Sequence, residues 1–179
     1  MTVLGRVLVG TAFAVYEPDG ILAYDELLLA VQVGRGGRPS VSVPYIWVDH
    51  PASLAGGRAL WSIPKQEAAF EIQRIDGAEG ADFAATAKAS QSVPLANLRF
   101  RSRTAMPGRW PVRATVVQRR LDDGRDHGLQ TTQARAWARV SLGSASWNFP
   151  RSGPLSFLRD CDPLVSTRLT DLSLWIGSS

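Results

Sequence analysis

Short runs of β-branched and aromatic residues, separated by turn sequences, follow one another along most of this chain of 179 residues. Such runs are typical of β-strands, and Pro18-Asp19-Gly20, Asp76-Gly77 and Asp123-Gly124 are typical of the turns between strands. Nine strands are predicted: Arg6–Tyr16, Ile21–Val33, Val41–Val48, Ala68–Ile75, Phe83–Ala89, Leu95–Thr104, Val112–Leu121, Gln130–Leu142 and Arg168–Ile176. Many strands with few helices favour antiparallel sheets closed into a barrel or packed as a sandwich.

One short helix is predicted between the strands. The run Asp49-His50-Pro51 is typical of a helix entry, because the Asp or His can cap the helix and the proline fits its first turn. We expect the helix to cover Ala52–Arg58 and the chain to become extended again at Trp61. A single helical turn is expected at Leu155–Arg159. No repeat, linker or low-complexity tract divides the sequence, so residues 1–179 are predicted to form one domain.

The N-terminal segment needs a choice between a strand and a signal peptide. Val7–Val15 is apolar but follows a single basic residue, Arg6, and Gly10 and Thr11 interrupt it, so a first strand explains it better. No apolar run reaches the roughly 18–20 residues of a membrane-spanning helix. We therefore expect a cytoplasmic protein with no membrane partner.

Metal and cofactor sites are not predicted. The one cysteine, Cys161, permits no internal disulfide, and the aspartates on either side of it disfavour the reactive thiolate. His50 and His127 are the only histidines, so a His/Cys metal site is not expected. The sequence also has no P-loop, no dinucleotide fingerprint and no Gly-x-Ser-x-Gly motif.

The cationic residues are divided very unevenly between arginine and lysine. Of 20 Lys and Arg residues only Lys65 and Lys88 are lysines. A compositional bias toward arginine is the simplest explanation, yet a retained lysine also indicates a need for an amine, because arginine neither deprotonates nor forms a Schiff base. Arg99, Arg101 and Arg103 share one face of a predicted strand, which we interpret as a solvated face or a subunit contact; nucleic acid is not a predicted partner.

Three segments in the first half of the chain resemble the acetoacetate decarboxylase superfamily. They are Tyr24–Glu26, Tyr45–Asp49 and Gly57–Lys65. In that family a strand carries an aromatic-x-Glu pattern, and its Glu precedes by 39 residues the first lysine of a Gly-Arg-Glu-Leu-x-x-hydrophobic-Pro-Lys-Lys run; Glu26 and Lys65 keep this separation. Ala145–Pro154 and Ser173–Ile176 are similar to the family's late aromatic-Gly-Pro segment and closing strand. The chain is therefore identified as a short, divergent member.

The resemblance implies a fold and a chemistry. The fold is mainly β, with antiparallel strands bent into a cone-shaped barrel around an apolar cavity and one or two short helices. The Lys65 amine would condense with a ketone to give an iminium ion that accepts electrons, and Glu26 would act as a general acid/base or orient the reacting groups. Acetoacetate decarboxylase is itself the established example of such a lysine. The substrate-binding candidates are Arg58, Tyr24, Trp61, Gln66, Thr11 and Trp147. A homo-oligomer is also implied.

Several positions depart from the family pattern. The second lysine of the motif is Gln66, the Glu of Gly-Arg-Glu-Leu is Ala59, and a further active-site acid, 15 residues before Glu26, is Thr11. The family arginine that meets the substrate carboxylate lies on an N-terminal extension, which this chain is expected to lack. Because these groups handle carboxylate chemistry, simple acetoacetate decarboxylation is not the expected reaction.

The expected function is an aldol, dehydratase, cyclase or lyase step on a polyketide-like or β-dicarbonyl keto substrate in secondary metabolism. Six tryptophans are available to line a pocket, although core packing is their ordinary role: Trp47, Trp61, Trp110, Trp137, Trp147 and Trp175. The alternative is a non-covalent cyclase or small-molecule-binding scaffold in which Lys65 and Glu26 act only through hydrogen bonds or charge.

Overall fold

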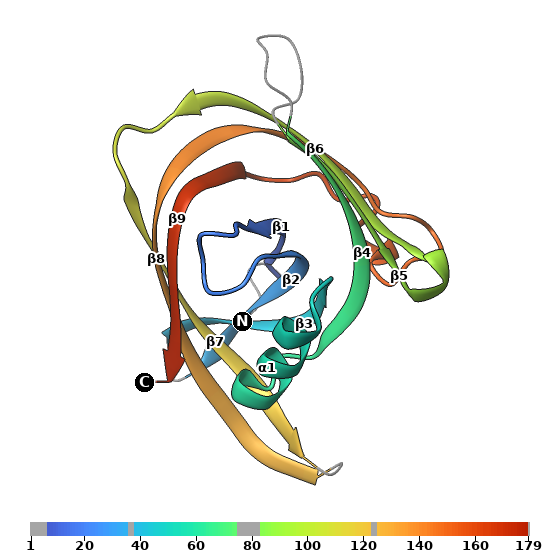
Figure 1. Cartoon of the computed structure of the whole chain (residues 1–179), viewed down its shortest axis with the longest axis vertical. Coiled ribbons are helices and arrows are strands. Elements are labelled where there is room, and N and C mark those ends of the chain that lie inside the picture. Colours follow the sequence, from blue (N-terminus) through green and yellow to red (C-terminus); the bar gives the residue numbers. More distant parts are fainter. Residues whose placement is uncertain (1–6, 36–37, 75–82, 123–124, 179) are drawn as a thin grey trace. The chain divides into compact units, whose positions relative to one another are not determined.

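The computed structural model describes residues 7–35, 38–74, 83–122 and 125–178 (Figure 1). The predicted turns at Asp76-Gly77 and Asp123-Gly124 lie outside these residues. The strands are β1 (Val9–Tyr16), β2 (Tyr24–Arg35), β3 (Arg38–Val48), β4 (Lys65–Arg74), β5 (Phe83–Ala89), β6 (Pro94–Ala105), β7 (Trp110–Asp122), β8 (Arg125–Asn148) and β9 (Ser166–Ser178). One α-helix, α1 (Pro51–Trp61), and two 3₁₀ turns, η1 (Ser90–Ser92) and η2 (Ser156–Leu158), complete the described elements. The mainly β prediction is confirmed.

The strands pair in the order β1-β2-β3-β4-β5-β6-β8-β7, with β9 paired to β8. A further pairing joins β3 to β7, at Val41 and Val116. Most pairs are antiparallel, as predicted, but β3 pairs in parallel with both β4 and β7. The β3–β4 pair is parallel because α1 reverses the chain between them, so that β4 starts beside Ile46, near the end of β3, and runs in the same direction; a tight turn would have given a hairpin.

Helix α1 is longer than predicted. It begins at Pro51 behind the N-cap His50, whose ring nitrogen Nδ1 accepts the Ala52 N–H at 3.2 Å. It continues to Trp61 and ends where Ser62 adopts a left-handed conformation (φ 52°) and the Ile63 N–H bonds to the Gly57 carbonyl at 3.1 Å. The expected end near Arg58 and the expected extended chain at Trp61 were both wrong, because the helix is capped only at Ser62 and Ile63, about one turn later.

The described chain divides into two compact units. The first contains residues 1–67, 112–135 and 174–179, and the second contains residues 68–111 and 136–173. The prediction of one domain over residues 1–179 stays a prediction. In the second unit, β5 and β6 bury one face through Ala85, Ala87, Leu98 and Phe100, while Arg99, Arg101 and Arg103 lie exposed along β6.

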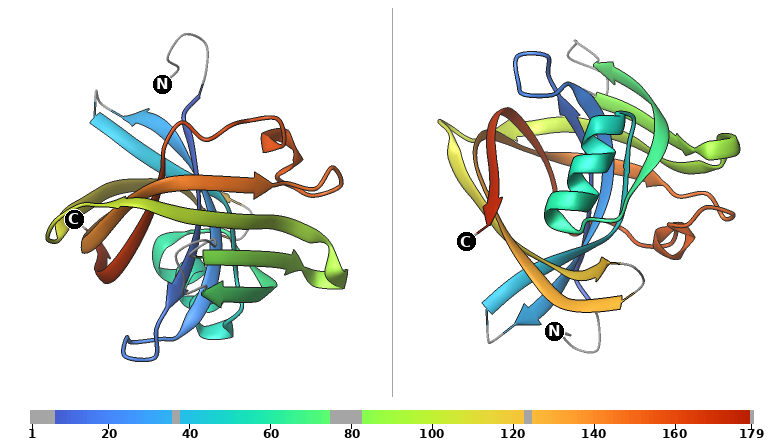
Figure 2. Two further views of the ribbon diagram at one scale, coloured as in Figure 1. Left: turned by 90° about the horizontal axis from the view of Figure 1, so that it is seen from above. Right: turned by 60° about the horizontal axis from the view of Figure 1, so that its bottom comes forward.

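The core of the first unit lies beneath α1. A buried cluster of Val43, Ile46 and Ile63 packs against Leu28, Ala30, Trp61 and Val116. Side chains alternate along β2, so Glu26 shares the face of Leu28 that meets this cluster, whereas Leu27 and Leu29 are buried on the other face. Figure 2 shows α1 lying over the sheet beside β3. A carboxylate is therefore placed at the edge of an apolar core.

Among the described residues, no helix has the length and apolar character needed to cross a membrane. The same described ranges contain no cluster of His, Cys, Asp and Glu suited to a metal ion, and Cys161 is exposed.

Candidate active site

The strand register brings Lys65 and Glu26 together across β3. Ile46 pairs with Leu28 on one side and with Lys65 on the other, and Val48 pairs with Glu26. Lys65 is the first residue of β4, which pairs directly with β3, and its long side chain extends across β3 to reach β2. The Lys65 Nζ atom lies 2.8 Å from Glu26 Oε2, and the exposed fraction of each side chain is only 5%.

Helix α1 holds the Lys65 side chain along its whole length. Ser53 and Gly57 are the only buried residues of α1, and they lie one turn apart on one face of the helix. Lys65 Nζ donates to Ser53 Oγ at 2.8 Å. A Cβ atom at Gly57 would lie 2.6 Å from Lys65 Cδ and 2.7 Å from Cε, so only glycine leaves room for this side chain. Arg58 Nε donates to the Lys65 carbonyl at 2.8 Å, which fixes the backbone of the same residue.

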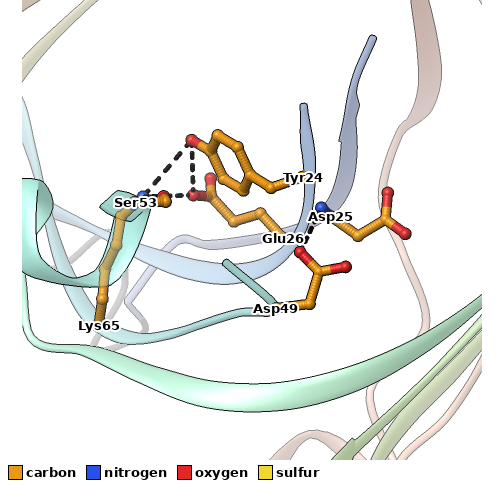
Figure 3. A network of polar contacts seen from close by, with 6 residues as sticks. All are labelled: Tyr24, Asp25, Glu26, Asp49, Ser53 and Lys65. Carbon is orange, nitrogen blue, oxygen red and sulfur yellow. Dashed lines mark hydrogen bonds and ion pairs between the residues drawn. The ribbon is translucent and has the colours of Figure 1, made fainter. Parts of the chain in front are cut away.

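Two tyrosines cover the other side of the carboxylate. Tyr24 OH lies 3.5 Å from both Lys65 Nζ and Glu26 Oε2, and its ring centroid lies 5.0 Å from Nζ (Figure 3). Tyr16 pairs with Tyr24 across β1 and β2, and the two rings stack with centroids 4.3 Å apart. The Tyr16 hydroxyl also interacts electrostatically with Tyr24 and Glu26. Five side chains, Tyr16, Tyr24, Glu26, Ser53 and Lys65, therefore form one buried polar network, which we call the lysine network.

Burial dominates the electrostatics of Glu26 within the lysine network. Burial raises the pKa of the Glu26 carboxyl above its ordinary value of 4.5, and this effect outweighs the opposing influence of Lys65 and of the two tyrosine hydroxyls. Burial, followed by the charge of Glu26, raises the pKa of Tyr16 above the usual range of a phenol, so Tyr16 remains a hydrogen-bond donor. A carboxyl that keeps its proton to unusually high pH is suited to general-acid chemistry.

Some predicted residues lie outside the lysine network. The register places Thr11 opposite Leu29, on the other face of the sheet from Glu26, and Gln66 opposite Trp47, on the other face from Lys65. Their assignment to substrate binding stays a prediction that the register does not favour. Gln66 directly follows Lys65 on β4 and therefore points to the opposite face, and Thr11 occupies a family position on β1 whose register pairs it with Leu29.

The other predicted positions have structural contacts. Trp61 packs against the Val43–Ile46–Ile63 cluster, and Trp147 belongs to the second unit, where it stacks on Phe149 with centroids 5.4 Å apart. Asp49 Oδ1 accepts the Asp25 N–H at 2.9 Å and so ties the end of β3 to the start of β2 next to Glu26 (Figure 3). Whether Trp61, Trp147 or Arg58 also contacts a substrate stays a prediction.

Sequence reasoning missed Tyr16 and Ser53. Tyr16 was accessible in principle, because it and Tyr24 flank the turn at Pro18-Asp19-Gly20 and a hairpin places such residues opposite each other. Ser53 carried no such signal, because its role depends on how α1 packs against Lys65.

Lys65 and Glu26 thus form a buried pair of an amine and a carboxyl on a mainly β fold. Comparison with known proteins gives the family. The acetoacetate decarboxylase (ADC) family matches residues 3–141, and this chain belongs to that family. No curated protein gives a significant match.

Solved structures show the same fold at low identity. The chain is similar to acetoacetate decarboxylase from Legionella pneumophila subsp. pneumophila str. Philadelphia 1, with 21% identity and a TM-score of 0.65 over 87% of this chain and 66% of that one. It is similar to the enduracididine biosynthesis enzyme MppR complexed with pyruvate, with 14% identity and a TM-score of 0.61 over 87% and 63% of the two chains. An acetoacetate decarboxylase-like enzyme from Sphingomonas wittichii RW1 has 15% identity and a TM-score of 0.58 over 87% and 67%. The chain thus spans just under two thirds of the first two proteins.

Proposed function

We propose that this chain is an enzyme that forms a Schiff base between Lys65 and the ketone of a polyketide-like or β-dicarbonyl substrate bound in an apolar cavity. One observation carries the proposal: the Lys65 Nζ atom lies 2.8 Å from Glu26 Oε2, with both side chains buried at the edge of the apolar cluster under α1. Burial of a lysine is costly, because desolvation penalises its charged form. A chemical role would explain why the chain retains a lysine at this position. The pair supplies a nucleophile and a proton donor together.

The first chemical step needs only groups of the lysine network. The lone pair of the neutral Lys65 amine attacks the ketone carbon, and a C–N bond forms while the carbonyl π bond breaks to give a carbinolamine. Glu26 then donates its proton to the carbinolamine oxygen, which leaves as water. The products are an iminium ion on Lys65, one water molecule and the Glu26 carboxylate, so atoms and charge balance. The raised pKa of Glu26 supports its role as the acid.

The step after iminium formation is proposed to be an aldol, dehydration, cyclisation or lyase reaction. Gln66 replaces the family's second lysine, and Thr11 replaces its second acid. The enduracididine biosynthesis enzyme MppR has been solved in complex with the condensation product of pyruvate and imidazole 4-carboxaldehyde, which supports the proposal. We place the present chain in the same broad chemistry, within secondary metabolism, and expect a cytoplasmic homo-oligomer.

Borohydride trapping tests the covalent proposal. The protein is incubated with pyruvate or acetylacetone, reduced with borohydride, and digested for peptide mass mapping. The expected result is a reduced adduct on Lys65 and none on Lys88, which is exposed and serves as an internal control. The Lys65→Arg variant, which retains a cation but has no amine nucleophile, should give no adduct. Failure of every β-dicarbonyl or 2-keto acid to modify Lys65 in the wild type would refute the covalent mechanism.

A second candidate is a non-covalent cyclase or binding scaffold. It is supported by the hydrogen bonding of Lys65, whose three ammonium protons already have acceptors in Glu26, Ser53 and Tyr24. In this case Lys65 acts through charge alone, and Lys65→Arg should keep most of the activity or ligand binding. A large loss in that variant favours the Schiff base.

A further inference from the structure

We propose that Ser53 accepts the one N–H proton that remains on Lys65 Nζ after condensation with a ketone, and so fixes the plane of the iminium. This inference rests on the proposed Schiff-base function. It adds a residue on α1 to a reaction for which the sequence indicated only Lys65 and Glu26.

Helix α1 is built around Lys65. Ser53 and Gly57 are its only buried residues, and both contact the Lys65 side chain. Gly57 lies against the methylene carbons, and Ser53 Oγ lies 2.8 Å from the amine. Because Ser53 is only 7% exposed, water does not compete freely for this hydroxyl. The side chain is therefore held so that its end always meets Ser53.

Counting protons on Nζ shows which contacts survive each step. As an ammonium, Lys65 has three N–H groups for Glu26, Ser53 and Tyr24. Transfer of one proton to Glu26 leaves an amine with two N–H groups, and its lone pair then faces Glu26. The amine can attack a ketone approaching from that side, and Glu26 then donates its single proton to the carbinolamine oxygen, which leaves as water. The resulting iminium retains a single N–H group, which can keep one strong partner.

Ser53 is the better of the two remaining acceptors. Its oxygen is 2.8 Å from Nζ, whereas Tyr24 OH is 3.5 Å away and also lies within reach of Glu26 Oε2. The iminium N–H carries positive charge, and charge-assisted hydrogen bonds are short and strong. An N–H held toward Ser53 fixes the rotation of the planar C=N unit, so one face of the former carbonyl carbon is directed toward the tyrosine side of the network and the other away from it.

The test compares Ser53 variants in trapping experiments with pyruvate. Ser53→Ala and the near-isosteric Ser53→Cys should both form the reduced adduct on Lys65 about 10- to 100-fold more slowly than wild type, because each loses a strong acceptor for a charged donor. Ser53→Thr, which retains a hydroxyl, should restore most of the rate. Reduction with borodeuteride reports the geometry directly: the wild type should give one epimer of the new stereocentre in excess, and Ser53→Ala should lose that excess.

Two controls separate this effect from general damage to the helix. Ser62→Ala removes a hydroxyl at the other end of α1 that donates to Gln130 at 2.7 Å, with no contact to Lys65, and should leave rate and stereochemistry unchanged. Tyr24→Phe should reduce the rate less than Ser53→Ala does and should preserve the stereochemical excess.

The outcomes distinguish the two proposals. Equal trapping rates and equal epimer ratios in wild type, Ser53→Ala and Ser53→Cys would overturn the role of Ser53 while leaving the Schiff base intact. Loss of the epimer excess in Tyr24→Phe but not in Ser53→Ala would also overturn it. Absence of any Lys65 adduct in the wild type would refute the proposed function, and this inference with it.

Discussion

The chain contains two lysines, and each lies beside a glutamate, but the two pairs differ in every other respect. Lys65 and Glu26 are 2.8 Å apart with 5% of each side chain exposed. Lys88 and Glu71, on paired strands of the second unit, are 3.3 Å apart with 45% and 69% exposed. The exposed pair has water as an alternative partner for both charges. The buried pair has only the lysine network.

The difference shows that chemistry here depends on burial and not on residue type. An exposed ion pair contributes about 0–1 kcal/mol. Burial raises the pKa of the Glu26 carboxyl above its ordinary value. The same two residue types thus give an ordinary surface contact in one region and a candidate acid and nucleophile in the other.

We expect the largest difference between the buried and the exposed ion pair when each lysine is replaced in turn. Lys65→Met leaves Glu26 buried without its cation and should destabilise the fold by about 3–5 kcal/mol at pH 8. Lys88→Met should change the free energy of unfolding by less than about 1 kcal/mol. Urea denaturation of both variants beside wild type checks this. Similar losses in the two variants would mean that burial does not distinguish the pairs.

The two adjacent glycines of α1 offer a steric version of the comparison. Gly57→Ala forces Lys65 away from Ser53 and Glu26 and should cost about 1–3 kcal/mol together with most of the Lys65 adduct. A Cβ atom at Gly56 would meet nothing within 4 Å, so Gly56→Ala should stabilise the helix by about 0.5–1 kcal/mol and leave trapping unchanged. Thermal unfolding and adduct yield measure both. Normal trapping in Gly57→Ala would contradict the packing described for Lys65.

Glu26 and Glu71 should differ, by a smaller amount, in how they affect the pH dependence of the free energy of unfolding. Because the pKa of Glu26 is raised in the folded state, the folded protein binds more protons than the unfolded chain above pH 4.5, and stability falls as pH rises toward the raised value. The slope from this one group is at most about 1.4 kcal/mol per pH unit. Glu26→Gln should remove this slope, and Glu71→Gln should leave it in place. Urea denaturation of wild type and both variants at several pH values from about 4 to 8 would measure this slope. Identical slopes in wild type and Glu26→Gln would contradict the raised pKa of Glu26.

The sequence was informative where function depends on spacing along the chain. The mainly β class and the helix after β3 follow from local patterns, and the resemblance to the acetoacetate decarboxylase family indicated Glu26 and Lys65 through their 39-residue separation. The structure places these two residues in contact. The actual bounds of α1 and of the 24-residue strand β8 did not follow, because packing overrides local turn and stop signals.

The sequence was uninformative where function depends on which face of an element is buried. Thr11 and Gln66 occupy motif positions, but alternation turns both away from the lysine network. Ser53 occupies no motif position and meets the amine, because Gly57 allows Lys65 to lie along α1. Such contacts follow only from the packing of a helix on a sheet.

The most direct test of the central claim uses the scarcity of lysine. Protein labelled with ¹³C at the ε-carbon of lysine gives two NMR signals from this sequence, and Lys88→Arg assigns them. Acetylacetone is then added without a reductant. The Lys65 signal should be replaced by that of an imine or enamine carbon while the Lys88 signal remains. An unchanged Lys65 signal, or equal changes at both lysines, would contradict the account.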